Sequence, residues 1–311
     1  MLTRRQVVKG LVTVPVATVA AGGYAVAEPF RLAVTRYRLT PKGWPKGLNL
    51  RIAALADIHA CEPWMSAARI RDIVAYTNSL APDVTLLLGD YVVGTRIGRY
   101  SRPVAIADWS QALGALRAPL GVHAILGNHD WWDDHEAQRR RAGPVRAGVA
   151  LERAGITVHE NTALRVMHRG RPLWLAGLGD QWAFWPRQHG RDRRAVRFGY
   201  QGVDDLATTL RQVTDEAPLI LMVHEPDVFP QVPDRVALTL AGHTHGGQVQ
   251  LFGYAPIVPS MYGRRYLYGH IVEQERNLIV SGGLGCSGVP VRFGRPPEIV
   301  IVELGEAPAI G

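Results

Sequence analysis

Five apolar segments of this chain each end in a short polar cluster that carries side chains able to bind metal ions. The clusters, in chain order, are Asp57-Ile58-His59, Gly89-Asp90, Gly127-Asn128-His129-Asp130, His224 and Gly242-His243-Thr244-His245. Each follows a run typical of a buried strand. Because open α/β sheets place their sites at the carboxyl ends of strands, the series predicts one site built from five strand ends.

The candidate ligands combine carboxylate, amide and imidazole groups. They are Asp57, His59, Asp90, Asn128, His224, His243 and His245, and His129 is left over. This mixture suits first-row divalent metals rather than Ca²⁺ or a thiolate site. Seven ligands are too many for one ion, but they suffice for two if one carboxylate and one water bridge them. Two ions ~3.5–4 Å apart lower the pKa of a bridging water and hold a phosphoryl group in line.

An alternative is that each histidine is an ordinary core or surface residue. That interpretation is usually right for one histidine, but it does not account for five clusters that each follow an apolar run.

The series resembles the calcineurin-like metallophosphoesterases, from about Leu48 to Leu304. The segments that resemble the bacterial exported or membrane-associated phosphodiesterases are His224-Glu225-Pro226-Asp227, Ala241–Gln248 and Gly283–Pro297. The resemblance implies the α/β class, as a four-layer α/β/β/α sandwich of two mixed sheets. It also implies a centre of two divalent ions, which would be Mn, Zn or Fe.

The same resemblance implies a role for each candidate residue. One metal would take Asp57, His59 and His245, the other would take Asn128, His224 and His243, and Asp90 would bridge both. His129 would protonate the leaving oxygen or stabilise its charge, oriented by Asp130. The family commonly has an acid three positions after the bridging Asp, and this chain has Val93 there. The change weakens the support for Asp90 but removes no ligand.

The remaining pattern predicts one domain over residues 28–311, with its motifs between about 48 and 304. We expect helices at Ala67–Leu80, Ala105–Leu116 and Val203–Val213. We expect a hairpin of Leu164–Met167 and Pro172–Leu178. Further strands are predicted at Arg31–Leu39, Leu48–Ala56, Val84–Leu88, Val122–Leu126, Leu219–Val223, Val236–Leu240, Gln248–Phe252, Leu278–Val280 and Ile299–Val302.

The first 27 residues have the features of an export signal. Arg4, Arg5 and Lys9 precede a short apolar stretch, and the small residues around Ala27 follow. A charged start, an apolar run and a small-x-small exit are typical of secretion, and the paired arginines resemble a twin-arginine signal. We therefore expect export by the machinery for folded proteins to the periplasm or cell envelope. Whether the segment is cleaved or kept as a membrane anchor stays open.

Composition excludes several other classes. Hydrophobic residues make up 47% and charged residues 20%, which excludes a disordered tail, a collagen-like fibre and a polytopic membrane protein. Two cysteines exclude a disulfide scaffold and a cysteine-built zinc site, and the pairing of Cys61 with Cys286 stays open. The formal net charge of +8 favours anionic partners, without indicating nucleic acid.

Two groups outside the motifs have both a functional and an ordinary interpretation. The tryptophans Trp131, Trp132, Trp182 and Trp185 would wall a substrate cleft, receive a lipid or sugar face, or simply pack in loops. The second group would hold phosphates or lipid headgroups, although a solvated face is the favoured interpretation. It comprises Arg187, Arg191, Arg193, Arg194 and Arg197.

The function predicted is hydrolysis of a phosphodiester or pyrophosphate bond by metal-activated hydroxide. The substrate would belong to the envelope or be linked to a lipid, and the membrane surface is a further candidate partner. An alternative is a UDP-2,3-diacylglucosamine-type pyrophosphate hydrolase of lipid A synthesis, although export argues against a cytoplasmic nucleotide-sugar. A non-catalytic metal-binding scaffold is the other class, and the complete ligand set argues against it.

Overall fold

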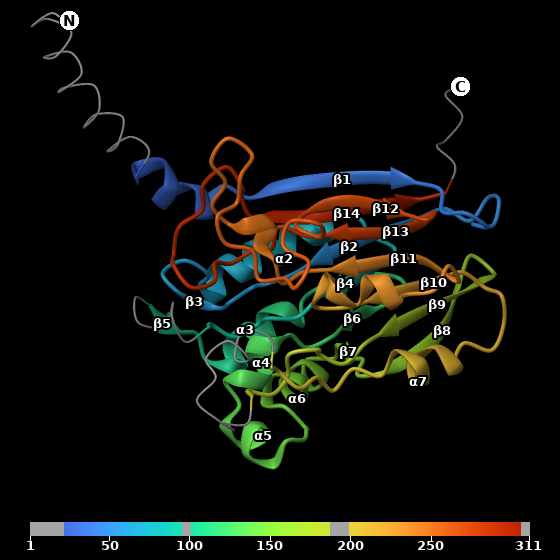
Figure 1. The fold of residues 1–311 in the computed structure, drawn as a ribbon, viewed down its shortest axis with the longest axis horizontal. Coiled ribbons are helices and arrows are strands. Elements are labelled where there is room, and N and C mark those ends of the chain that lie inside the picture. Colours follow the sequence, from blue (N-terminus) through green and yellow to red (C-terminus); the bar gives the residue numbers. More distant parts are fainter. Residues whose placement is uncertain (1–21, 95–100, 187–198, 306–311) are drawn as a thin grey trace, which may run out of the picture.

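Two six-stranded sheets lie face to face at the centre of the molecule (Figure 1). The computed structural model describes residues 22–94, 101–186 and 199–305. The first sheet has the order β1 (Ala33–Leu39), β14 (Glu298–Leu304), β2 (Leu50–Leu55), β4 (Val84–Leu87), β6 (Val122–Ala124) and β7 (Thr157–Val158). Strands β2, β4, β6 and β7 run parallel, while β14 is antiparallel to β2.

The second sheet is also mixed, with antiparallel strands at both edges. Its order is β12 (Gly269–Glu273), β13 (Arg276–Val280), β11 (Val236–Ala241), β10 (Leu219–Met222), β9 (Arg171–Gly177) and β8 (Thr162–His168). The four inner strands are parallel to their inner neighbours. Because parallel strands are buried on both faces, they carry the continuous apolar runs seen in the sequence.

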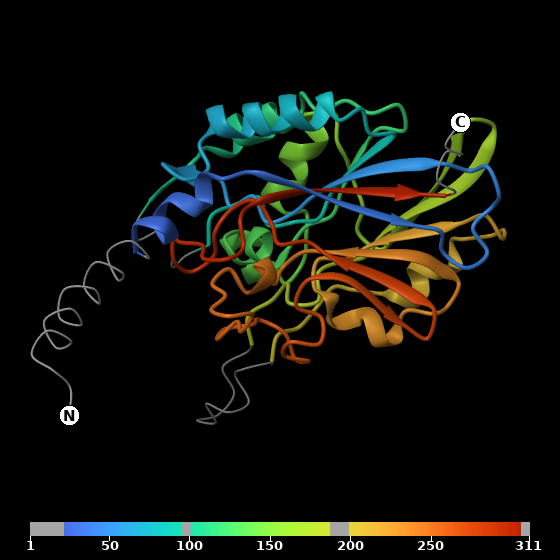
Figure 2. The same cartoon turned by 90° about the horizontal axis from the view of Figure 1, so that it is seen from above.

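The main core lies between the sheets, and helices cover both outer faces. Ile52 and Leu86 of the first sheet and Ile220 and Leu240 of the second belong to one fully buried cluster. Helices α2 (Ala67–Ser79), α3 (Ile106–Leu113) and α6 (Arg146–Arg153) cover the first sheet, whereas α7 (Leu206–Arg211) and the short 3-10 helix η4 (Pro226–Gln231) cover the second (Figure 2). The predicted α/β/β/α layers are confirmed.

Most predicted elements are present. Helix α2 begins after Ser66, whose hydroxyl accepts a hydrogen bond from the Arg69 amide, and β8 and β9 form the predicted hairpin. The predicted helix at Val203–Val213 is shorter, because the Asp205 side chain caps α7 at the Thr208 amide. Strand β12 and helices α4 (Asn128–Trp132), α5 (His135–Arg140) and α6 were not predicted.

The predicted strand at Gln248–Phe252 is wrong. This segment makes only two isolated bridges, one from Val249 to Phe293 and one from Leu251 to Tyr254. Gln248 and Phe252 have φ angles of 51° and 50°, which are incompatible with an extended strand. The segment is a loop that turns back on itself.

Several sequence predictions fall on parts of the chain that are not described. Most of the expected export signal, residues 1–21, and the arginine run within 187–198 lie outside the described residues. Within the described residues, no helix is both long enough and apolar enough to cross a membrane. Cys61 and Cys286 are free, buried thiols that share a small cluster with Val93. The two-stranded sheet of β3 (Cys61–Glu62) and β5 (Arg102–Pro103) lies beside it.

Candidate metal centre

The candidate ligands gather where the carboxyl ends of the two sheets meet. Strands β2, β4 and β6 are parallel neighbours, so Asp57, Asp90 and Asn128 follow them at one edge of the first sheet. Strands β10 and β11 are parallel neighbours in the second sheet, so His224 and His243 follow them at the facing edge. The sheet order therefore brings five separate loops to one place.

One group of ligand atoms comes from Asp57, His59 and His245. Their oxygen and nitrogen atoms all lie within 4.8 Å of one another. His59 Nε2 lies 3.1 Å from His245 Nε2, and His245 Nε2 lies 3.5 Å from Asp57 Oδ1. The other nitrogen of His59, Nδ1, lies 2.9 Å from the Val92 carbonyl oxygen, to which it can donate only when protonated. That bond directs the free Nε2 lone pair into the group.

A second group comes from Asp90, His224 and His243, again within 4.8 Å. His224 Nδ1 donates to the Leu88 carbonyl oxygen at 2.6 Å, which leaves Nε2 facing Asp90. Asn128 joins this group, since its Oδ1 lies 2.9 Å from His243 Nδ1.

Asp90 lies between the two groups. Its Oδ2 is 3.6 Å from His59 Nε2 in the first group and 3.2 Å from His224 Nε2 in the second. Its Oδ1 accepts a hydrogen bond from the His129 amide at 2.8 Å, which fixes the carboxylate. One oxygen of a single carboxylate therefore faces ligands of both groups.

The backbone around these ligands is strained. Five of the seven candidate ligands have φ between 47° and 68°, in the left-handed region that non-glycine residues seldom adopt: Asp57, His59, Asp90, His243 and His245. A Cβ on Gly127 would lie 2.4 Å from Asp90 Oδ1, so only glycine fits there. Each such residue costs roughly 1–3 kcal/mol, and strain of this kind gathers at functional sites.

Burial and the Asp90 carboxylate together set the protonation of the candidate ligands. Burial raises the pKa of Asp57 to about 7 and lowers the pKa of His59 to about 4 and that of His243 to about 3. Burial also acts to lower the pKa of His224, but the Asp90 carboxylate outweighs it and holds that pKa well above the ordinary value. Burial thus favours neutral imidazoles at His59 and His243, whereas the Asp90 carboxylate favours the charged form of His224.

Buried polar atoms without partners test whether divalent ions fit here. His243 Nε2 is buried and makes no hydrogen bond, and the partner of the buried His224 Nε2 is the Asp90 carboxylate, 3.2 Å away. Buried polar groups are nearly always partnered, and an ion is one accepted reason for an exception. Neutral imidazole and carboxylate are also the donors that first-row divalent metals prefer. The residues therefore fit a pair of such ions.

His129 and Asp130 are placed differently from each other. The His129 ring packs edge-on against His59 and Trp132, with centroids 5.0 and 5.1 Å away, and its buried Nδ1 has no hydrogen-bond partner. Asp130 does not orient that ring, contrary to expectation. Its two oxygens instead accept backbone hydrogen bonds from Gly127, Asp90, Tyr91 and Val92. Asp130 thus connects its own loop, which follows β6, to the loop after β4 that carries Asp90.

A cleft of about 490 Å³ opens above the candidate ligands, with Asp90, Asn128 and His129 on its floor. One wall consists of stacked aromatic rings, with Trp132 4.3 Å from Trp185 and Trp182 5.0 Å from Tyr200. Three of the four singled-out tryptophans line this cleft: Trp132, Trp182 and Trp185. Trp131 is instead fully buried against Phe184.

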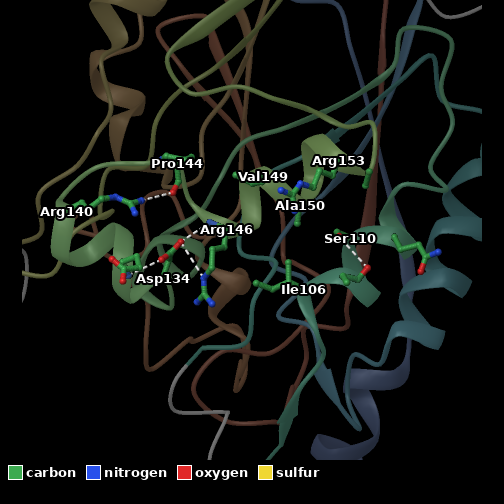
Figure 3. Close-up of a pocket in the computed structure, with 13 residues that line it drawn as sticks. Ile106, Ser110, Asp134, Arg140, Pro144, Arg146, Val149, Ala150 and Arg153 are labelled. Carbon is green, nitrogen blue, oxygen red and sulfur yellow. Dashed lines mark hydrogen bonds and ion pairs between the residues drawn. The ribbon is translucent and has the colours of Figure 1, made fainter.

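A larger cavity of about 720 Å³ lies between α3, α5 and α6, away from these ligands (Figure 3). Its two carboxylates are already committed to structure, because Glu136 pairs with Arg139 and Asp134 accepts backbone hydrogen bonds. Asp134 Oδ1 caps α5 at the Glu136 and Ala137 amides, and Oδ2 accepts from the Arg146 amide. Cavity volume therefore does not identify the site in this molecule.

Two features of the centre were not predicted. Asp180 and Glu225 are buried carboxyls that form a third close group with His224. Burial, and then the Glu225 charge, hold the pKa of Asp180 well above its ordinary value. The signal was present, because Gly179-Asp180 follows strand β9 just as Gly89-Asp90 follows β4. Arg292, fully buried with Nη2 3.4 Å from His245 Nδ1, lies in the Gly283–Pro297 segment that resembles the family, but no role was assigned to it there.

This arrangement of strand-end loops and paired ligand groups is that of a metal-dependent phosphoesterase. Residues 50–247 match the family model of the calcineurin-like phosphoesterases, and the chain belongs to that family. Members use a dinuclear centre of divalent metal ions, for which the candidate ligand groups are present here.

Several relatives match nearly the whole chain. The uncharacterized metallophosphoesterase YkuE of Bacillus subtilis is 28% identical, over 97% of this chain and 98% of the relative. Phosphodiesterase YaeI of Escherichia coli is also 28% identical, over 98% of this chain and 100% of the relative. Among solved structures, the NAD nucleotidase of Haemophilus influenzae is 14% identical, with a TM-score of 0.46 over 76% of this chain and 51% of that chain.

Proposed function

We propose that this protein hydrolyses a phosphodiester or pyrophosphate bond in the cleft above the two ligand groups. The observation that carries the proposal is the position of Asp90, one oxygen of which faces His59 of the first group and His224 of the second. A pair of ions bridged by one carboxylate is the arrangement that suits in-line displacement at phosphorus. The name of the similar YaeI protein, a phosphodiesterase, supports a diester substrate.

In this proposal, the ligands divide as the distances group them. Asp57, His59 and His245 would hold one ion. Asn128, His224 and His243 would hold the other, and Asp90 would bridge them. When bound, two such ions supply a water of lowered pKa and positive charge beside the phosphoryl oxygens. The chain's own contribution is to fix the ligand atoms, which it does through the hydrogen bonds of His59 to Val92 and of His224 to Leu88.

His129 would act on the leaving group. Its ring lines the cleft and is held between His59 and Trp132, while its amide is tied to Asp90. Burial lowers the pKa of His129, and the Asp90 carboxylate opposes that change. The imidazole would donate a proton or a hydrogen bond to the departing oxygen, which matters most when that oxygen belongs to a poor leaving group.

The walls of the cleft favour a substrate with an apolar or flat group beside its phosphate. Stacked rings from Trp132, Trp182 and Trp185 form one side, while Val249 and Ile257 lie among the apolar residues of the lining. Aromatic walls receive sugar, base or lipid faces. Together with the export signal expected in residues 1–27, this supports an envelope or lipid-linked phosphodiester or pyrophosphate.

A substrate panel tests the proposal. The purified protein, loaded separately with Mn²⁺, Zn²⁺, Fe²⁺ or Mg²⁺, is assayed on bis-p-nitrophenyl phosphate, on p-nitrophenyl phosphate and on an alkyl pyrophosphate. We expect turnover of the diester or the pyrophosphate to exceed that of the monoester with at least one metal. Preference for the monoester with every metal would contradict the proposed bond type, and no turnover at all would favour a scaffold.

A further inference from the structure

One loop of the molecule exposes an unusual amount of apolar surface. We call residues 250–262, between η5 (His245–Gly247) and β12, the tip loop. Six of the fifteen large apolar side chains exposed among the described residues belong to it: Leu251, Phe252, Tyr254, Ile257, Met261 and Tyr262. Phe252 is wholly exposed, with a relative exposure of 109%. Exposed patches of this kind mark binding surfaces.

The tip loop is held in this shape by specific bonds. Buried Asp227 accepts hydrogen bonds from the Ser260 hydroxyl at 2.5 Å and from the Met261 amide at 2.7 Å. The Leu251 and Tyr254 backbones bond each other reciprocally at 2.9 Å. Phe252 sits at the turn between them with φ of 50°, a conformation that costs energy for an aromatic residue. The fold therefore holds the Phe252 side chain exposed at some cost in stability.

The sequence of the tip loop and its flanks carries cationic but no acidic residues. The sequence has no Asp or Glu between Arg235 and Glu273, and none between Glu275 and Glu298. Arg264 lies over the Tyr254 ring, 5.2 Å from its centroid, and donates to the Gly253 carbonyl oxygen. An apolar and aromatic tip with an exposed arginine behind it matches the two layers of an anionic membrane surface, where apolar groups enter the interface and cations meet phosphates.

The position of the loop relates it both to the cleft and to the start of the chain. Ile257, together with Pro256 and Pro259 of the same loop, lines the cleft of the candidate metal centre. Next to the loop, the Arg292 amide donates to the Ala25 carbonyl oxygen, and Phe293, which bonds Gln250, packs on Tyr24. Figures 1 and 2 both show residues 22–30 and the tip loop at the same end of the molecule. The first described residues, 22–30, therefore lie beside the tip loop.

We propose that the tip loop docks into the surface of an anionic phospholipid bilayer, with Phe252 and its neighbours entering the interface and Arg264 facing the headgroups. Docking at this end places the mouth of the cleft at the lipid surface. The docking itself is independent of the proposed hydrolysis. Only its consequence, that the enzyme reaches a lipid-borne phosphodiester or pyrophosphate, rests on the proposed function.

A fluorescent label at the tip tests the docking directly. Cys61 and Cys286 are buried, so a Phe252→Cys variant of the full chain can be labelled at position 252 with an environment-sensitive nitrobenzoxadiazole dye. Met167→Cys, on exposed β8 toward the opposite end of the molecule, is the matched control. We expect a blue shift at 252, and none at 167, on vesicles that contain phosphatidylglycerol. The shift should be smaller on pure phosphatidylcholine.

Three results would overturn the proposal. The first is a label at 252 that stays in water although the protein sediments with vesicles, which would assign binding to the N-terminal segment alone. The second is a protein that does not bind vesicles at all. The third is a shift that occurs only on membranes that contain envelope proteins, which would indicate a protein partner in place of lipid.

A pair of double variants measures the contribution of the loop. Leu251→Ser with Phe252→Asn should weaken partitioning onto anionic vesicles roughly tenfold or more, while Leu164→Ser with Met167→Ser should leave it unchanged. Equal partitioning of the two would contradict the proposal. Hydrolysis of soluble bis-p-nitrophenyl phosphate by the same samples separates membrane docking from the proposed hydrolysis. Docking without hydrolysis would refute only the proposed function. Hydrolysis without docking would refute only the proposed docking of the tip loop.

Discussion

The described residues include two clusters of buried histidines, and only one of these two has the features of a metal centre. The second cluster is the pair His123 and His159 at the edge of the first sheet. His123 Nε2 lies 2.9 Å from the Leu120 carbonyl oxygen, and His123 Nδ1 lies 3.0 Å from His159 Nε2. His159 Nδ1 completes the chain, 3.0 Å from the Thr162 hydroxyl. Every ring nitrogen of this pair has a partner.

Burial and pKa do not distinguish the two clusters. Burial lowers the pKa of His159 to about 4, just as it lowers the pKa of His59 to about 4. The difference lies in what faces the nitrogens. Around His224 and His243 there are buried carboxylates, an unpartnered nitrogen of His243 and left-handed backbone, whereas the His123–His159 pair closes on itself. A buried histidine indicates a site when its free nitrogen faces charge and lacks a hydrogen bond.

The largest effect should come from Asp90. We expect Asp90→Ala to lose bound metal and to lower kcat/KM by more than ~10⁴-fold, the most that one proton-transfer group contributes. The reason is that Asp90 Oδ2 faces both ligand groups. Metal content per chain, by elemental analysis, is the measurement.

The matched control for Asp90 is a change in the other cluster. His159→Gln removes a buried imidazole that has no carboxylate partner and should keep both ions. Two ions retained by the Asp90 variant would refute the bridging role. Metal lost from the His159 variant would abolish the contrast between the clusters.

The next effect concerns His129, which lies in the centre without a ligand role. His129→Ala should keep both metals and lose roughly 10²–10⁴-fold in kcat/KM on alkyl diesters. The loss on nitrophenyl diesters should be smaller, because nitrophenolate needs little help to leave. The ratio of the two losses measures the leaving-group contribution. Equal losses would make His129 a charge-stabilising or positioning group, and lost metal would make it a ligand.

Much of this site could be predicted from the sequence because its ligands follow strands. Parallel strands end at one edge, so Asp57, Asp90 and Asn128 were bound to be neighbours once the strands were recognised. The layered fold followed from the same apolar runs. Asp180 carries the same signal, a Gly-Asp pair after a strand, but it was not predicted as a site residue because the pair belongs to none of the five clusters.

Other features depend on distances that periodicity does not encode. Asp130 follows His129 in the chain, yet helix α4 turns its carboxylate toward the backbone of the neighbouring loop. Trp131 and Trp132 are adjacent, and α4 sends one into the core and the other into the cleft. The segment Gln248–Phe252, which overlaps the start of the tip loop, was predicted to be a strand because its residues favour strands, but positive φ angles at Gln248 and Phe252 override that preference.

The His123–His159 pair should appear in the pH dependence of stability. The pKa of both residues is lowered by burial, that of His159 from 6.5 to about 4. Their contribution is therefore complete above pH 6.5. As pH falls from 6.5 toward 4, the unfolded chain takes up protons that the folded chain does not, so the unfolding free energy decreases. For His159 the loss is roughly 3 kcal/mol.

Comparison with His159→Gln isolates this effect. The glutamine amide can still donate to His123 Nδ1, but it does not titrate. Urea unfolding from pH 7 to 4 should show a steeper decline for the natural protein than for the variant. Parallel declines would mean that the pair does not control acid stability and that other buried groups do.

The smallest effect tests whether the histidine chain needs its last link. Thr162 is exposed, although its hydroxyl meets the His159 ring at 3.0 Å. In Thr162→Val, water can take the place of the hydroxyl, so we expect the unfolding free energy to fall by less than ~1 kcal/mol. Metal content and kcat/KM should not change, because none of His123, His159 and Thr162 belongs to a ligand group. A loss above ~2 kcal/mol would show that His159 Nδ1 is closed to water, and the pair would then tolerate an unpartnered nitrogen as poorly as any sealed core.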